Sequence, residues 1–306
     1  MVRRNYTYIA FGVGVLLIVA GALKVPGGIA AGGGLAFLAI ILFGLSFIPR
    51  SEPPADAPPP MSFFDRLTGI FFEPSNVFRN LRAHPRWLSA AIIIALLSFA
   101  YTTAFTYRLT PERIVSFTME KVAERFNVPA EQLEQSKEQQ ITESKSPTRI
   151  AANAITKFVG VFVVTAIFAA LYMLAVLLFG GRLGFWQSLS VTLYAALPAA
   201  IISNILSIVL LYVKDPDDIH PILGQGGLVT DNLSMLVKSA EHPVLYTVLG
   251  FFGVLSFYRL WLLATGLRNG GERVSPSTAW TVALIFWVLL LMLSAGFSLL
   301  FGNFIS

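Results

Sequence analysis

A single arginine interrupts an apolar stretch that is otherwise long enough to cross a membrane. Arg259 lies within residues 244–267, roughly 13 Å along a helix from Arg268. A guanidinium in hydrocarbon needs a polar helix atom or a phosphate as partner. The stretch at 189–213 offers neutral partners beside Pro198, whose ring frees a helical carbonyl: Tyr194, Ser203, Asn204 and Ser207. We therefore expect Arg259 to bind this kinked helix or a lipid phosphate; the alternative is a boundary arginine that reaches the inner headgroups.

Groups that could catalyse a reaction are scarce. The chain has no cysteine, which excludes a thiolate nucleophile and a thiolate metal site. His84, His220 and His242 stand beside prolines between the apolar stretches, and those stretches hold no Asp, Glu, His or Lys. No Walker, H-E-x-x-H or G-x-S-x-G motif is present. We expect no enzymatic activity and no cofactor.

One hydrophilic segment carries acids close to an imidazole. Asp215, Asp217, Asp218 and His220 lie within six residues, and Asp231 follows. Oxygen ligands with an imidazole can bind a divalent cation, although the spacing matches no EF-hand loop. Aspartates beside proline are also common turn residues. The turn interpretation is favoured, and no metal is expected.

Four arginines in residues 61–86 could bind anions: Arg66, Arg79, Arg82 and Arg86. Apolar residues at helical spacing precede and follow Glu73-Pro74-Ser75, which indicates two short amphipathic helices lying on the inner leaflet. One interpretation is a surface that docks anionic lipid or a partner. The other is a positively charged segment that only sets the topology of the next span.

The elements that must position these groups are membrane helices. Of 306 residues 55% are hydrophobic and 13% charged, about half the charge of a soluble domain. Seven uncharged or nearly uncharged stretches approach the length of roughly 20 residues that a helix needs to cross a bilayer. They are 8–23, 29–48, 87–107, 158–179, 189–213, 244–267 and 279–301. The sequence predicts an all-α polytopic membrane helix bundle of seven spans.

Short-loop charges predict the orientation. Ten arginines fall in segments that are cytoplasmic if the N-terminus is inside, against Lys24, Lys214 and Lys238 outside. We expect a cytoplasmic N-terminus and an extracytoplasmic C-terminus.

The chain divides at a proline-rich linker, 49–60. Before it lies a two-span hairpin, 1–48, whose first stretch has the alternative of a cleaved signal peptide. In that hairpin the Gly28 to Gly32 spacing allows close helix contact and dimerisation. After the linker, 61–306 forms a five-span core with a helical insertion at 108–157, which either caps the bundle or is a solvated connector.

Several motifs in order resemble the bacterial members of the Ypt-interacting-protein (Yip) domain family. They are F-F-E-P-S-N-V-F-R-N-L-R-A-H-P-R-W at 71–87, L-Y-A-A-L-P at 193–198, L-W-L-L-A-T-G-L at 260–267 and S-P-S-T-A-W at 275–280. The resemblance covers about residues 71 to 300. It implies a five-span core with a cytoplasmic N-terminus and an outward C-terminus, in a bacterial cytoplasmic membrane. In eukaryotic relatives the family is linked to Rab GTPases and vesicle traffic. The eukaryotic D-L-Y-G-P motif is absent here, so that role transfers poorly.

These observations predict a non-enzymatic membrane protein that organises membranes or acts as a trafficking-related scaffold. Its expected partners are the lipid bilayer, including anionic phospholipid, a membrane or soluble protein, and a second copy of itself; no nucleic acid is expected. The alternative is a transporter or channel for a small or lipidic solute. A polar cavity lined by Arg259, Tyr194 and Asn204 would favour that alternative.

Overall fold

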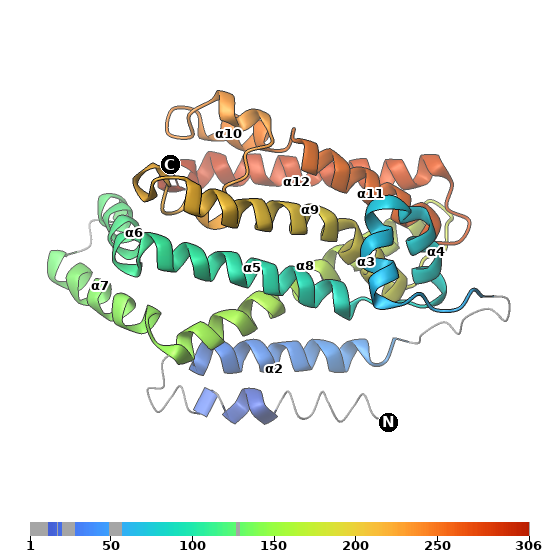
Figure 1. Ribbon diagram of the computed structural model, residues 1–306, viewed down its shortest axis with the longest axis horizontal. Helices are drawn as coiled ribbons and strands as arrows, with labels where there is room; N and C mark the ends of the chain where they lie inside the picture. Colours follow the sequence, from blue (N-terminus) through green and yellow to red (C-terminus); the bar gives the residue numbers. More distant parts are fainter. Residues whose placement is uncertain (1–11, 17, 20–27, 49–56, 127–128, 306) are drawn as a thin grey trace.

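The structure is a bundle of helices that run nearly side by side (Figure 1). The computed structural model describes residues 12–16, 18–19, 28–48, 57–126 and 129–305, and these contain helices and two isolated β-bridges but no strand. The α-helices are α2 (Gly28–Leu45), α3 (Phe63–Phe72), α4 (Pro74–Ala83), α5 (Leu88–Leu109), α6 (Pro111–Phe126), α7 (Ala130–Ser144), α8 (Pro147–Leu178), α9 (Phe185–Val213), α10 (Pro243–Gly250), α11 (Val254–Gly270) and α12 (Pro276–Ile305). Short 3₁₀ turns are η1 (Pro216–Asp218), η2 (Leu223–Gly226) and η3 (Leu233–Leu236). The all-α prediction is confirmed.

Four of these helices are long and apolar enough to cross a membrane. They are Leu88–Leu109, Pro147–Leu178, Phe185–Val213 and Pro276–Gly302, and Gly32–Leu45 is a shorter apolar helix. The first expected span, 8–23, lies largely outside the described residues. The prediction of a polytopic membrane bundle is therefore confirmed, whereas the count of seven spans is not.

The stretch at 244–267 is two helices rather than the single span that we expected. The chain leaves the helical path at 251–253, between α10 and α11. Asp231 from the preceding loop caps the new helix: its carboxylate accepts from the Leu255 amide at 2.6 Å, and its carbonyl accepts from the Val254 amide at 3.3 Å. Gly253 permits this approach, because a Cβ there would lie 2.8 Å from the Cβ of Asn232. The cap satisfies amides that a helix start would otherwise leave unbonded.

Helix α9 forms the centre of the bundle. Its first half is buried around its whole circumference, including Tyr194 and Pro198, and it packs against α4, α5, α8 and α11. Gly266 of α11 makes one of these contacts close: a Cβ there would lie 2.6 Å from Val191. Small residues of this kind are what let membrane helices approach each other.

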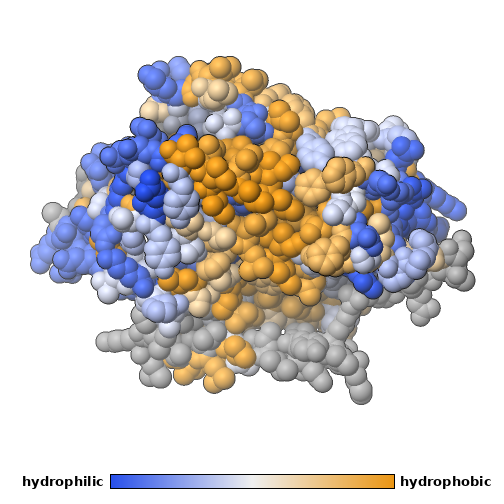
Figure 2. Space-filling view, viewed as in Figure 1, coloured by the Kyte–Doolittle hydropathy of each residue, from blue (hydrophilic) through white to orange (hydrophobic). Residues whose placement is uncertain are grey.

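The two ends of the bundle are polar and differ in construction. Helices α3 and α4, which we call the elbow, lie across one end, and the α6–α7 hairpin stands at the other (Figure 1). Figure 2 shows an apolar belt between hydrophilic ends on the face in view. A belt of this kind is the surface that a bilayer requires. With the long apolar helices, it defines a multi-pass membrane protein.

The N-terminal region packs onto this bundle. Helix α2 lies along α8 and adds Leu38 to the main core, although the linker separates it in sequence. Gly32, whose spacing from Gly28 allows close helix contact, faces Gly14 of the same chain, where an added Cβ would lie 2.5 Å from the Gly14 carbonyl oxygen. The Gly32 side of α2 is thus already occupied. Residues 49–56 of the linker lie outside the described residues.

The insertion at 108–157 is a helical hairpin that docks on the bundle, and α8 begins earlier than expected, at Pro147. Arg113 of α6 donates to the Pro216 carbonyl at 2.6 Å and pairs with Asp217 at 3.1 Å. The Phe117 ring packs edge-on against His220 at 5.0 Å. Of the two interpretations left open by the sequence, these contacts match a cap on the bundle.

Candidate functional site

The elbow is attached to the bundle by a buried polar cluster. Arg66 of α3 is only 4% exposed. Its Nε donates to the Tyr194 hydroxyl at 3.0 Å, and its guanidinium also donates to the Met61 carbonyl. The same Tyr194 hydroxyl lies 3.0 Å from the Ser89 hydroxyl of α5. We call Arg66, Tyr194 and Ser89 the buried arginine cluster; it joins α3, α5 and α9.

Local sequence signals shape the elbow. Ser62 and Asp65 form a capping box that begins α3. Glu73 ends α3 and precedes Pro74, which occupies the first turn of α4, where its missing amide hydrogen costs nothing. The two predicted short helices are therefore present.

Apolar and polar contacts fix α4 in place. Val77, Phe78 and Leu81 are fully buried, and α4 packs on α11. Asn80 donates to the Pro59 carbonyl at 2.9 Å and accepts from the Met61 amide at 3.1 Å. These bonds hold the end of the linker against α4, and the packing on α11 places α4 on the bundle.

The outward side of the elbow combines aromatic rings with arginines. Phe64 and Phe72 are 71% and 84% exposed. Arg79 and Arg86 are exposed as well, and within the described part of the chain Arg79 bonds only to its own helix, at Ser75 and Asn76. This surface can place aromatic rings among lipid chains and cations at the headgroup level.

The four arginines predicted for this region thus have three different environments. Arg66 is buried in the core instead of facing lipid, which corrects our expectation for that residue. Arg82 forms an ion pair with Glu272 at 3.0 Å across to the loop between α11 and α12. Only Arg79 and Arg86 present their charge outward without a carboxylate partner among the described residues.

The structure does not bring together the cluster predicted around Arg259. Tyr194 bonds to Arg66 and Ser89, and the Asn204 amide bonds back to the Ala200 carbonyl at 2.8 Å. Arg259 is exposed on α11 and forms no hydrogen bond or ion pair with any other described residue. The sequence led us to expect Tyr194 beside Arg259, whereas its partner in the structure is Arg66.

The acidic loop residues serve the fold. The His220 Nδ1 accepts from the amides of Ile222 and Leu223 at 3.2 Å each, and burial together with nearby Lys121 lowers the pKa of His220. An imidazole that accepts backbone bonds at Nδ1 turns one of its two possible ligand atoms away from a metal. Asp217 pairs with Arg113, while Asp231 caps α11. The described residues contain no group of three His, Cys, Asp or Glu that could hold a metal ion.

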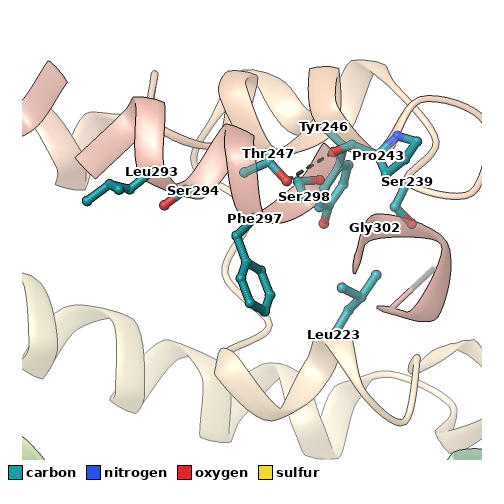
Figure 3. A pocket seen from close by; sticks show the side chains of 10 residues that line it. All are labelled: Leu223, Ser239, Pro243, Tyr246, Thr247, Leu293, Ser294, Phe297, Ser298 and Gly302. Carbon is teal, nitrogen blue, oxygen red and sulfur yellow. Dashed lines mark hydrogen bonds between the residues drawn. The ribbon is translucent and has the colours of Figure 1, made fainter. Parts of the chain in front are cut away.

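A cavity of about 580 Å³ lies between α10, α12 and η2 (Figure 3). None of Arg259, Tyr194 and Asn204 lines it. It is therefore not the polar cavity that would have favoured transport through the centre of the bundle.

Fold and site together define an α-helical, multi-pass membrane protein whose elbow packs on its core. The profile of the Yip1 domain matches residues 68–297, three quarters of the chain, so the protein belongs to the Yip1 domain family. The match begins inside α3 and ends inside α12, which leaves α2 and the linker outside. Comparison with curated proteins and with solved structures gives no match.

Proposed function

We propose that the protein is a non-enzymatic membrane scaffold that contacts anionic phospholipid through the outward side of its elbow. The proposal rests on the different environments of the elbow arginines. Arg66 holds the elbow on the bundle, while Arg79 and Arg86 keep their charge outward. Because the elbow is fixed to the bundle, a lipid bound at its outward side is also held against the bundle.

The chemistry of the outward side matches an anionic leaflet. Phe64 and Phe72 supply apolar area next to the cations, and aromatic rings prefer the headgroup level. Each arginine near an anionic surface contributes about 1 kcal/mol of attraction. Two such residues give about 2 kcal/mol, a difference of roughly thirty-fold in affinity.

The charge distribution supports the membrane and orientation we propose. Arg182 pairs through its backbone with Glu272, and Arg82 also pairs with Glu272, so these loops lie at the elbow end with Arg268 and Arg273. Arginine in short loops favours the cytoplasmic side. We therefore propose that the elbow and N-terminus lie on the cytoplasmic side and the C-terminus outside. The resemblance to bacterial members of the family extends the proposal to a bacterial cytoplasmic membrane.

The experiment compares lipid retention by two variants that lose the same charge. Full-length protein is reconstituted with phosphatidylglycerol and phosphatidylcholine, and bound lipid is counted by native mass spectrometry. The Arg79→Gln/Arg86→Gln protein should lose its preference for phosphatidylglycerol. The matched control, Lys157→Gln/Lys214→Gln, removes two exposed cations at the hairpin end and should keep that preference. Equal loss in both variants, or in neither, would contradict the proposal.

A second function, movement of a lipidic solute, is favoured by one observation. Arg259 lies exposed in α11, six residues after the helix break, and forms no hydrogen bond or ion pair with another described residue. Broken helices and intramembrane charges are common in transport paths. The purified protein in vesicles should then move a fluorescent anionic phospholipid between leaflets, and Arg259→Ala should stop it. Vesicles in which no lipid moves would leave the scaffold as the only candidate.

A further inference from the structure

The cavity between α10 and α12 has the lining of a lipid site. Figure 3 shows Phe297 of α12 and Leu223 of η2 on opposite sides of the same space. Its volume of about 580 Å³ is in the range of small-molecule sites. None of its ten lining residues is charged.

Hydroxyl groups give this apolar space a polar side. Ser239, Ser294, Ser298 and Thr247 all line the cavity. Thr247 donates to the Pro243 carbonyl at 3.0 Å, whereas the Ser298 hydroxyl has no hydrogen-bond partner among the described residues. Ser298 is only 7% exposed, so bulk water reaches it poorly. Its hydroxyl borders the cavity, where it can donate to an acceptor atom of a ligand.

The cavity is continuous with the surface that faces lipid. Leu293 and Phe297 line it and are 70% and 56% exposed, and their neighbours Met292 and Leu300 on α12 are exposed as well. Helix α10, the opposite wall, has no buried residue. A chain from the surrounding bilayer can therefore enter between the two helices without leaving hydrocarbon.

We propose that this cavity binds an acyl chain of a membrane phospholipid, with an ester oxygen accepting from the Ser298 hydroxyl. The uncharged lining offers no counter-ion for a phosphate or another free anion. Apolar walls with a few hydroxyls match the chain and ester region of a lipid, which carries acceptors and no charge. The site lies at the hairpin end, opposite the elbow, so it is independent of the lipid contact proposed there.

The test maps where lipid chains touch the protein. Full-length protein is reconstituted in vesicles that contain a trace of phosphatidylcholine with a diazirine on one acyl chain, and crosslinks are mapped by mass spectrometry after illumination. Tyr246 and Thr247 of α10 and Ser298 of α12 should carry about five-fold more label than the lipid-facing Leu289 and Met292, as a site stronger by about 1 kcal/mol requires.

Two variants of α12 separate the cavity from the general lipid surface. Ser294→Leu fills the cavity and should lower its label about five-fold. Gly296→Leu adds similar volume where a Cβ meets nothing within 4 Å, and should leave the label unchanged. The proposal would be overturned if the cavity residues carried no more label than Leu289. It would also be overturned if a folded Ser294→Leu protein carried as much label in the cavity as the wild type. If Ser294→Leu fails to fold, the wild-type map alone decides.

Discussion

Removing one hydroxyl from the buried arginine cluster should loosen the elbow without touching its surface. Tyr194→Phe leaves the Nε of Arg66 without its acceptor at 3.0 Å, at a site where Arg66 is 4% exposed. A hydrogen bond to a charged group contributes about 1.5 to 3 kcal/mol. This exceeds the average of about 0.6 kcal/mol for hydrogen bonds between membrane helices, because the donor here carries a charge that is shielded from water.

The absence of cysteine gives a direct assay for this effect. Val77 of α4 is fully buried and lies against Gly69 of α3, so Val77→Cys reacts with a thiol reagent only when α3 moves away. In the Tyr194→Phe background its labelling rate should rise by about 10- to 150-fold, which is the free energy above expressed as an opening equilibrium. Leu211→Cys, equally buried at the hairpin end, should label at the same rate in both backgrounds.

A small increase in the labelling rate of Val77→Cys would refute the role assigned to Arg66. A rise of less than about three-fold corresponds to roughly 0.6 kcal/mol, the contribution of an ordinary neutral bond between membrane helices. Arg66 would then not be what holds the elbow. The double variant Arg66→Met/Tyr194→Phe should cost less than the two single changes added together, because it leaves no buried charge unpaired.

Two further predictions concern the core and the hairpin. Gly266→Ala should destabilise the protein by about 1 to 3 kcal/mol in detergent unfolding, because its Cβ meets Val191 at 2.6 Å, while Gly296→Ala should change little. Glu112 accepts from Lys145 at 2.5 Å, and this contact lowers the pKa of Glu112 below 4.5. The contact therefore stabilises the hairpin above pH 4.5 and is lost as pH falls through the lowered pKa. Hydrogen exchange should detect this opening, and Glu112→Gln should remove its pH dependence.

The membrane helices could be predicted because hydropathy alone determines them. Four of the expected stretches overlap long apolar helices, and the elbow follows from the proline after Glu73. The break at 251–253 has no such signal. It depends on Asp231, about 20 residues earlier in the sequence, whose carboxylate meets the Leu255 amide only in the folded chain.

The burial of Arg66 did leave a signal in the sequence. Arg66 lies four residues before the fully buried Ile70, so the two side chains share one face of α3. We grouped it with Arg79 and Arg86 by residue type rather than by helical position. Its partner could not be found in this way, because Tyr194 is 128 residues distant and no local pattern connects them.

The two ends of the bundle are held by different interactions, and this makes their roles separable. At the elbow end the buried charge of Arg66 is satisfied by the Tyr194 hydroxyl and the Met61 carbonyl, so the docked position of α3 depends on a few bonds. At the hairpin end Tyr101 bonds to the Gly224 carbonyl and Arg113 to the carbonyl of Pro216, around a second small apolar core. Changes to the outward arginines of the elbow therefore leave both attachments intact, and a loss of lipid preference in those variants reports on contact rather than on folding.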